Sequence, residues 1–318
     1  MITLTLTVEA QKDFTVKTDS STIETKFYPG GKEVREILKQ KNLVYYKFYR
    51  NNLKILTSTA TYDKSDRLIG IAKEYNNNGK FLYQIDYDKG LWTVANKKIY
   101  PYFDLQFKMK QKADSLIASV YGKQFLLNNA VWNVSGSYIY NKDESGNWTD
   151  IFKSKPNKFL FRYAVKLDKE HIYNDLIEFE LDTDGNYLSN PYEEVFGFEK
   201  IAKNQKKGFL LSYDNAIKIA KQKGLVENDS TKASAFLKWE NIKESKLHKG
   251  HFRFYVIIKT ISIKNLNPKG RSSVTDKYDV YSFNPWTAEY LETKKMKSIR
   301  SWEQHSGSNT GLLPDDEK

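Results

Sequence analysis

The first hundred residues alternate apolar and polar positions over short stretches, and Gly or Asn residues separate these stretches. Alternation with a period of two is typical of a strand that is buried on one face. Three similar turns recur, at Tyr28-Pro-Gly-Gly-Lys32, Tyr49-Arg-Asn-Asn-Leu-Lys54 and Tyr75-Asn-Asn-Asn-Gly-Lys80. Because Gly and Asn tolerate the positive φ of tight turns, residues 1–103 are predicted to form an array of antiparallel β-hairpins that stack on their neighbours.

Helical periodicity replaces this alternation in two later stretches. The first covers residues 107–121 and ends before Gly122, and the second begins at Ser212, a good N-cap, and ends at Gly224. The apolar positions are Leu105, Met109, Ala113, Leu116, Ile117 and Val120 in the first stretch, and Ala216, Ile217, Ala220 and Leu225 in the second.

Strands are predicted after each helix, at 125–140, 158–167 and 172–181 and again at 235–242, 251–263 and 277–283. A turn and a further short strand follow the last of them. The order of one helix and three strands therefore occurs twice, which predicts an α+β fold of mostly antiparallel sheet. The expected organisation is a hairpin array at 1–103, two helix-plus-sheet units at 104–200 and 201–302, and a loose polar tail at 303–318.

A family resemblance supports the hairpin array. Tyr62-Asp-Lys-Ser-Asp-Arg-Leu-Ile-Gly70, Lys73-Glu-Tyr-Asn-Asn-Asn-Gly-Lys80 and Tyr87-Asp-Lys-Gly-Leu-Trp92 resemble MORN-variant repeats of the YwqK-like antitoxin type. The similarity covers roughly residues 25 to 95. Membership would imply a stacked hairpin array used for binding, with no chemistry of its own.

A second resemblance covers residues 212–291. Leu211-Ser-Tyr-Asp-Asn-Ala-Ile-Lys-Ile-Ala220 and Asn284-Pro-Trp-Thr-Ala-Glu289 resemble the helix and the closing turn of a PepSY domain, although Ala288 stands where that family usually has Gly. Phe179-Glu-Leu-Asp-Thr-Asp-Gly-Asn186 is similar to the closing strand and turn of a first copy. The resemblance implies two PepSY-like units and an association with the binding and inhibition of proteins or peptidases outside the cytoplasm.

The charge of the chain permits an acidic partner. Lys and Arg number 51 against 39 Asp and Glu, so the net charge is +12. This balance would attract an acidic protein, nucleic acid or an anionic membrane surface. The Lys residues are spread along the chain, and the densest runs are short, which favours solvated surface over a nucleic-acid site. These runs are Lys294, Lys295, Lys297 and Arg300, and Lys203, Lys206 and Lys207.

Neither Cys content nor hydropathy fixes the compartment. The absence of Cys excludes disulfides, thiolate metal sites and a Cys nucleophile. No stretch approaches the roughly 18 apolar residues of a membrane helix. Residues 1–8 alternate, which predicts a strand rather than a signal peptide. A periplasmic or cell-envelope location is expected if a signal peptide has been removed, and a cytoplasmic one otherwise.

The candidates for chemistry are few. His248 and His251 stand three residues apart near Glu240 and Glu244, but a surface pair is favoured over a metal site because no converging ligands are evident. Asp182-Thr-Asp-Gly-Asn186 is similar to the start of a calcium loop, yet it lacks a distal acid, so a hairpin turn is predicted. Nucleophile elbows and phosphate-binding loops are absent. We therefore expect no enzyme, no catalytic residue, no cofactor and no metal.

Aromatic residues, at 14% of the chain, have three alternative roles: sheet core, protein interface or a stacking surface for single-stranded nucleic acid. The predicted partner-binding residues are Tyr62, Tyr75, Tyr87 and Trp92, on one face of the repeat array. The alternative is that these Tyr residues only stack hairpin on hairpin.

The expected function is non-catalytic protein binding. An immunity or inhibitor protein that occludes a toxin or secreted enzyme, for example an acidic one, fits both family resemblances. The alternatives are an envelope-associated structural or interaction protein and a single-stranded nucleic-acid binder.

Overall fold

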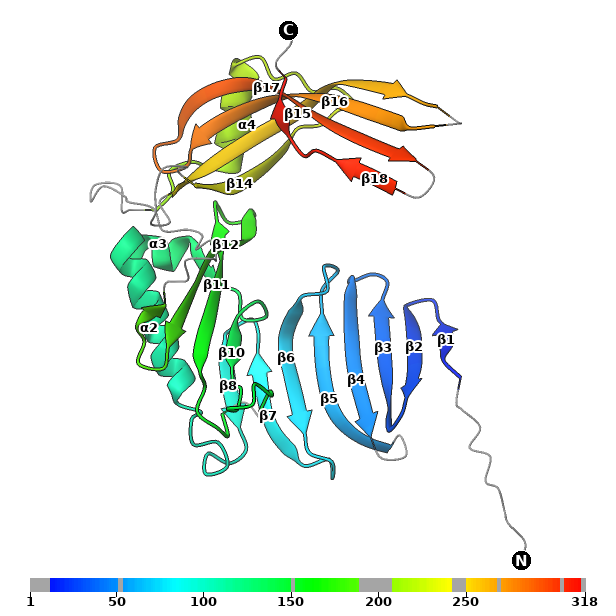
Figure 1. Ribbon diagram of the computed structural model, residues 1–318, viewed down its shortest axis with the longest axis vertical. Coiled ribbons are helices and arrows are strands. Elements are labelled where there is room, and N and C mark those ends of the chain that lie inside the picture. The colour runs from blue at the N-terminus through cyan, green and yellow to red at the C-terminus, as the bar shows by residue number, and fades with distance from the viewer. Residues whose placement is uncertain are drawn as a thin grey trace, which may run out of the picture. The chain divides into compact units, whose positions relative to one another are not determined.

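A computed structural model describes residues 12–50, 54–149, 152–188, 208–241, 250–267, 270–303 and 306–315 (Figure 1). The chain divides into two compact units. The first combines residues 1–107 with 134–159, and the second combines 108–133 with 160–318. The strand predicted at residues 1–8 lies outside the described residues.

The first unit contains an eight-stranded antiparallel sheet, here the N-terminal sheet, whose strands lie side by side in sequence order (Figure 1). Its order β1 to β8 means that every neighbour in the sequence is also a neighbour in space. The predicted hairpins are thus joined edge to edge through backbone hydrogen bonds. The strands are β1 Phe14–Lys17, β2 Ser21–Tyr28, β3 Gly31–Leu38, β4 Leu43–Arg50, β5 Ile55–Tyr62, β6 Leu68–Tyr75, β7 Phe81–Asp86 and β8 Leu91–Val94.

Local side-chain chemistry explains the turns of this sheet. Between β2 and β3, Pro29 precedes Gly30, which has a φ of 85°, and Tyr28 pairs with Gly31. Between β6 and β7, Oδ1 of Asn76 accepts hydrogen bonds from the backbone N–H groups of Asn78 and Lys80, both at 2.9 Å. An Asn or Asp side chain that closes its own turn in this way replaces a backbone contact. The predicted hairpins at these two turns are therefore confirmed.

One end of the N-terminal sheet packs against the segment that follows it. Tyr100, Phe103 and Phe152 form a buried cluster, against which Tyr83 and Trp92 of the sheet pack. The ring of Trp92 meets that of Phe152 edge-on, with centroids 5.1 Å apart. Burying such rings supplies apolar area that holds Tyr100, Phe103 and Phe152 on the sheet.

The second unit begins with a helical pair and a small sheet. Helix α2 (Leu105–Tyr121) buries Met109, Ala113 and Ile117, as its periodicity predicts. Strand β11 (Lys158–Lys166) pairs with β9 (Ala130–Trp132) and β12 (Ile172–Asp182), and β12 pairs with β13 (Tyr187–Leu188). Strand β10 (Tyr138–Tyr140) belongs to the first unit.

The sequence prediction of a strand at 125–140 is wrong in its first part. Helix α3 (Lys123–Asn128) occupies this place, after a break at Gly122, whose φ is 90°. Phe125 is fully buried and its ring contacts those of Tyr121 and Trp286. This contact with a residue far along the sequence stabilises a helical turn where the local apolar run favours a strand.

The rest of the second unit is a helix on a six-stranded sheet, here the C-terminal sheet. Helix α4 (Tyr213–Gln222) begins at the predicted N-cap, since Oγ of Ser212 accepts a hydrogen bond from the N–H of Asn215 at 3.3 Å. Of the apolar positions named above, Ala216 and Ala220 are buried, whereas Ile217 is only half-buried. The core of the sheet contains buried side chains from β14 and β15, namely Trp239, Phe254, Val256 and Ile258.

The C-terminal sheet extends further than predicted. Its strands are β14 Ser234–Asn241, β15 Gly250–Asn265, β16 Ser272–Asn284, β17 Glu289–Glu303, β18 Ser306–Asn309 and β19 Leu313–Pro314. Strand β17 is long rather than short. The prediction of a loose tail at 303–318 is wrong for its described residues, because β18 and β19 both pair with β17. Two ion pairs hold this end, from Asp315 to Lys277 at 3.0 Å and to Lys297 at 3.3 Å.

An aromatic cluster and one carboxylate tie the parts of the second unit together. The ring of Trp286 stacks on Tyr121, with centroids 5.7 Å apart, and meets Phe209 at 4.6 Å. Oδ2 of Asp168 accepts a hydrogen bond from the N–H of Tyr213, the first residue of α4, at 2.9 Å. A carboxylate at the N-terminus of a helix is favourable because the helix dipole is positive there.

Candidate functional site

The first unit contains a cavity of about 450 Å³, here called the aromatic cavity. Residues of β6, β7 and β8 form its floor, and the segment 134–149 forms its wall. Cavities of 300 to 1,000 Å³, roughly, suit small ligands. Its aromatic lining residues are Tyr83, Tyr87, Trp92, Tyr138 and Trp148, and its polar ones include Glu74, Ser135, Ser137, Asn141 and Thr149.

The register of the sheet places the floor residues on one face. Glu74 lies directly opposite Tyr83, and Ile85 lies directly opposite Trp92. Directly opposed residues of antiparallel strands project to the same side. Side chains at alternate positions of β6 and β7 therefore point into the cavity together.

The turn between β7 and β8 fixes Tyr87. Oδ1 of Asp86 accepts hydrogen bonds from the N–H groups of Asp88 and Lys89, at 3.2 and 3.1 Å. The N–H of Tyr87 donates to the carbonyl oxygen of Gly70 at 2.8 Å, and the N–H of Gly70 donates to Oδ1 of Asp88 at 2.9 Å. Gly70 has a φ of 59°, which a β-branched residue adopts only with strain. This double link holds the phenol ring of Tyr87 at the cavity.

Among the described residues that line the aromatic cavity, Glu74 is the only one with a charged side chain. Burial raises the pKa of its carboxyl group, while a hydrogen bond from Ser58 and the charge of Arg50 act in the opposite direction. Oγ of Ser58 donates to Oε1 of Glu74 at 2.7 Å. Burial, with smaller effects from Tyr62 and Glu74, raises the pKa of Tyr87 to about 12. Both groups are thus held in an environment that disfavours their charged forms.

The structure brings three of the four predicted partner-binding residues together. Tyr87 and Trp92 line the aromatic cavity, and Tyr62 lies opposite Leu68, another lining residue. Tyr75 does not line the cavity, and its ring meets that of Phe81 edge-on at 6.0 Å. All four side chains are half-buried. Trp92 also packs against the buried cluster that contains Phe152, so it both stabilises the sheet and lines the cavity.

Sequence reasoning missed Glu74, Tyr138 and Trp148. Alternation along β6 places Glu74 on the same side as Leu68 and Ala72, which was a usable signal. Nothing local places Tyr138 and Trp148 against the sheet, since that contact joins segments about sixty residues apart in the sequence.

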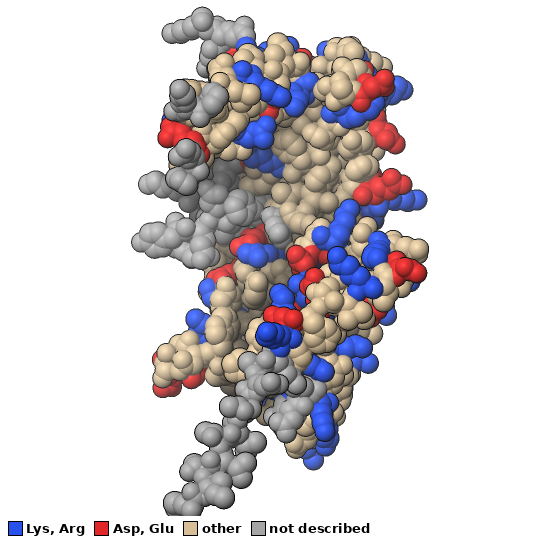
Figure 2. Space-filling view, turned by 90° about the vertical axis from the view of Figure 1, so that its right-hand side faces the viewer, with Lys and Arg blue, Asp and Glu red and all other residues tan. Residues whose placement is uncertain are grey.

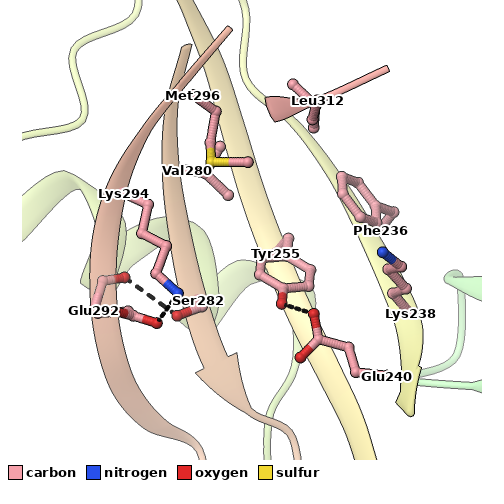
Figure 3. Close-up of a pocket in the computed structure, with 10 residues that line it drawn as sticks. All are labelled: Phe236, Lys238, Glu240, Tyr255, Val280, Ser282, Glu292, Lys294, Met296 and Leu312. Carbon is pink, nitrogen blue, oxygen red and sulfur yellow. Dashed lines mark hydrogen bonds and ion pairs between the residues drawn. The ribbon is translucent and has the colours of Figure 1, made fainter. Parts of the chain in front are cut away.

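A second, smaller hollow of about 210 Å³ lies on the C-terminal sheet (Figure 3). Strands β14 to β17 contribute its floor, and Leu312 reaches it from the end of the chain. In Figure 3 the hydroxyl of Tyr255 points at the carboxylate of Glu240, and Lys294 points at Glu292. The Lys294–Glu292 ion pair measures 2.7 Å.

Glu240 joins two other side chains beside this hollow. The hydroxyl of Tyr255 donates to Oε1, and Nε2 of His251 lies 3.3 Å from Oε2. Burial and the bond to Glu240 raise the pKa of Tyr255, and burial, together with Arg253, lowers the pKa of His251. Glu240 thus stabilises a neutral phenol. The group is a hydrogen-bonded cross-strand cluster, without a nucleophile beside a base.

The metal candidates of the sequence have other partners. Oδ1 of Asp182 accepts hydrogen bonds from the N–H groups of Asp184 and Asn186, at 2.9 and 2.8 Å, in the predicted hairpin turn between β12 and β13. His251 lies beside Glu240, and His248 and Glu244 lie outside the described residues. In the described ranges, no group of three or more His, Cys, Asp and Glu side chains is placed to hold a metal ion.

The surface seen in Figure 2 carries both signs of charge. Lys and Arg side chains lie among Asp and Glu on this face. Within the run at 294–300, Lys295 pairs with Asp279 at 2.6 Å and Arg300 with Asp276 at 3.4 Å. The described part of the chain contains no helix long and apolar enough to cross a membrane.

Comparison with known proteins identifies no family. No protein-family model matches the chain, and no curated protein matches it. Among solved structures, a crystal structure of lipopolysaccharide binding protein aligns over 96% of this chain and 76% of its own, at 8% identity and a TM-score of 0.14. A score this low does not establish a common fold.

Proposed function

We propose that the protein is a non-catalytic binding protein that contacts another protein through one face of its N-terminal sheet. The observation that supports this is the alignment of Tyr46, Tyr62, Tyr87 and Trp92 on that face, here the aromatic face. The rings of Tyr46 and Tyr62 meet edge-on, with centroids 6.2 Å apart. Tyr62 lies directly opposite Leu68, which lines the aromatic cavity. Tyr and Trp are enriched among the residues that dominate binding energy at protein interfaces.

The aromatic face is suited to a partner because its rings are neither fully buried nor fully exposed. Tyr62, Tyr87 and Trp92 are half-buried, so they are held in place and still offer surface. Burial raises the pKa of Tyr46 to about 12 and also raises that of Tyr62, which keeps both phenols neutral at physiological pH. Rigid, neutral aromatic side chains lose little conformational entropy when a partner covers them.

Inhibition of the partner is the role we favour. The repeats similar to MORN-variant antitoxins and the helix and closing turn similar to PepSY both suggest an immunity or inhibitor protein that occludes a toxin or secreted enzyme. An envelope-associated interaction protein without inhibitory action would use the same face. Co-purification of an enzyme that regains activity when the protein is removed would favour inhibition.

The test is capture of partners from a lysate of the native cell by the purified protein. Wild-type protein is compared with a Tyr62→Ala/Tyr87→Ala double variant and with Tyr45→Ala. Tyr45 is the matched control, since it is 37% exposed and neighbours Tyr46 on the opposite face of β4. Circular dichroism melts establish that all three proteins are folded.

A partner retained by the wild type and by Tyr45→Ala, and lost by the double variant, would support the proposal. Equal recovery by all three proteins would contradict it. So would tight binding to random single-stranded DNA that weakens steeply with salt, with no protein recovered, because release of counterions is characteristic of nucleic-acid binding.

A further inference from the structure

We propose that the aromatic cavity is a binding site for an organic cation, an ammonium or guanidinium group attached to a small apolar body. The site does not depend on the protein partner proposed above. It follows from the combination of aromatic walls with a single half-buried carboxylate, that of Glu74.

The charge of the cavity favours a cation. Glu74 is the only ionisable acid or base among its lining residues apart from the tyrosines, and no Lys or Arg lines it in the described part of the chain. The one hydrogen bond that the described residues give this carboxylate comes from Ser58. Arg50 acts on it electrostatically, but the two side chains form no ion pair within the described residues. An anionic ligand would meet a like charge here, whereas a cation would offset the cost of burying the carboxylate.

The aromatic lining also favours a cation. The faces of Trp and Tyr rings attract ammonium and guanidinium groups within about 6 Å of the ring centre, and more strongly where water is excluded. Tyr87 and Trp92 come from the floor, and Tyr138 and Trp148 from the wall, so rings face the cavity from both sides. A neutral apolar ligand would use the same rings but would bring no positive charge to Glu74.

Two of the chain's own lysines lie over aromatic rings at the wall, one of which lines the cavity. Nζ of Lys142 lies 4.9 Å from the ring centroid of Trp148, and Nζ of Lys158 lies 4.6 Å from that of Tyr140, which stacks on Trp148. Neither Lys142 nor Lys158 lines the cavity. One ring of its wall, that of Trp148, is therefore engaged by a cation from outside the cavity.

The test is a fluorescence titration, because Trp92 and Trp148 line the cavity. The probes are two matched pairs, choline with its neutral carbon analogue 3,3-dimethyl-1-butanol, and N-acetyl-arginine amide with N-acetyl-citrulline amide. The variants are Glu74→Gln, Tyr87→Phe and Tyr87→Leu. Glu33→Gln is the control, because Glu33 is a carboxylate of β3 that does not line the cavity.

We expect at least one cation to bind about tenfold more tightly than its neutral analogue, because one desolvated charge contact contributes on the order of 1 to 2 kcal/mol. Glu74→Gln removes the negative charge and should abolish that difference. Tyr87→Phe and Glu33→Gln should bind as the wild type does, and Tyr87→Leu should bind more weakly. Preference for choline would indicate a free small amine as the natural ligand, and preference for the arginine compound would indicate a side chain presented by a peptide or protein. Equal binding of cation and neutral analogue, an unchanged preference in Glu74→Gln, or no saturation by any probe at millimolar concentration would overturn the proposal.

Discussion

Replacing Trp286 by Ala tests whether the second unit is held together by its aromatic cluster. Trp286 is 3% exposed, and its ring lies 4.6 Å from Phe209, 5.3 Å from Phe125 and 5.7 Å from Tyr121. These residues come from α2, α3 and the segment before α4, so the substitution removes a contact that joins separate elements.

The expected loss of stability is large. Substituting a buried Trp or Phe by Ala costs about 3 to 5 kcal/mol, because apolar contacts are lost and a cavity remains. Each favourable ring pair contributes on the order of 0.5 to 1.5 kcal/mol beyond its buried area, and Trp286 makes three. We therefore expect a loss near the upper end, about 4 to 5 kcal/mol. With a urea m-value of about 2 kcal/mol per molar, the unfolding midpoint should fall by about 2 M.

The assay is urea unfolding followed by far-ultraviolet circular dichroism, with Trp302→Ala as control. Trp302 lies in the same unit but is 41% exposed, so its removal should cost about 1 kcal/mol or less. If the two units unfold in separate transitions, only one transition should shift in Trp286→Ala. A midpoint for Trp286→Ala close to that of Trp302→Ala would refute the packing argument.

Three further predictions concern caps and titration. Ser212→Ala should lower the stability of the second unit by about 1 kcal/mol in urea unfolding, because the N–H of Asn215 loses its acceptor, and a change below experimental error would contradict the cap. Burial raises the pKa of Asp168, but hydrogen bonds from Tyr213, His171 and Glu170 outweigh it and hold the pKa below its usual range. Because the pKa of Asp168 is lower in the folded than in the unfolded protein, where it is about 3.9, ionised Asp168 stabilises the fold at pH values above 3.9. This stabilisation is lost as the pH falls through the folded pKa. Asp168→Asn should therefore make the free energy of unfolding less dependent on pH in the acid range. Choline affinity should rise as pH increases through the raised pKa of Glu74, since the ionised carboxylate attracts the cation, and should be independent of pH in Glu74→Gln.

Turns and helix ends that depend on hydrogen bonds between residues close in the sequence could be predicted. The turns at Pro29-Gly30 and at Asn76–Gly79 follow from residues that close their own turns, and helix α4 follows from Ser212 and the apolar positions after it. Helix α3 was missed because Phe125 is held by Trp286, about 160 residues later, and this contact has no local signal. Propensity is a weak predictor where tertiary packing decides.

The end of the chain and the cavity wall were missed for the same reason. Residues 306–315 are mostly small or polar and carry no strong strand pattern. Their pairing with β17 and the ion pairs of Asp315 determine their structure. The repeated turns indicate Tyr62, Tyr75, Tyr87 and Trp92 as candidates, and their role in partner binding stays a prediction. The association of Tyr87 and Trp92 with Trp148 could not be predicted, because it depends on a connection that folds back onto the sheet.

Hydrogen–deuterium exchange on the complex with the captured partner tests the central claim most directly. If the aromatic face is the binding surface, exchange should slow in β5 to β8, around Tyr62, Tyr87 and Trp92, while the C-terminal sheet exchanges as in the free protein. The Tyr62→Ala/Tyr87→Ala variant should show no such protection at the same partner concentration. Protection confined to the C-terminal sheet, with exchange in β5 to β8 unchanged, would contradict the account.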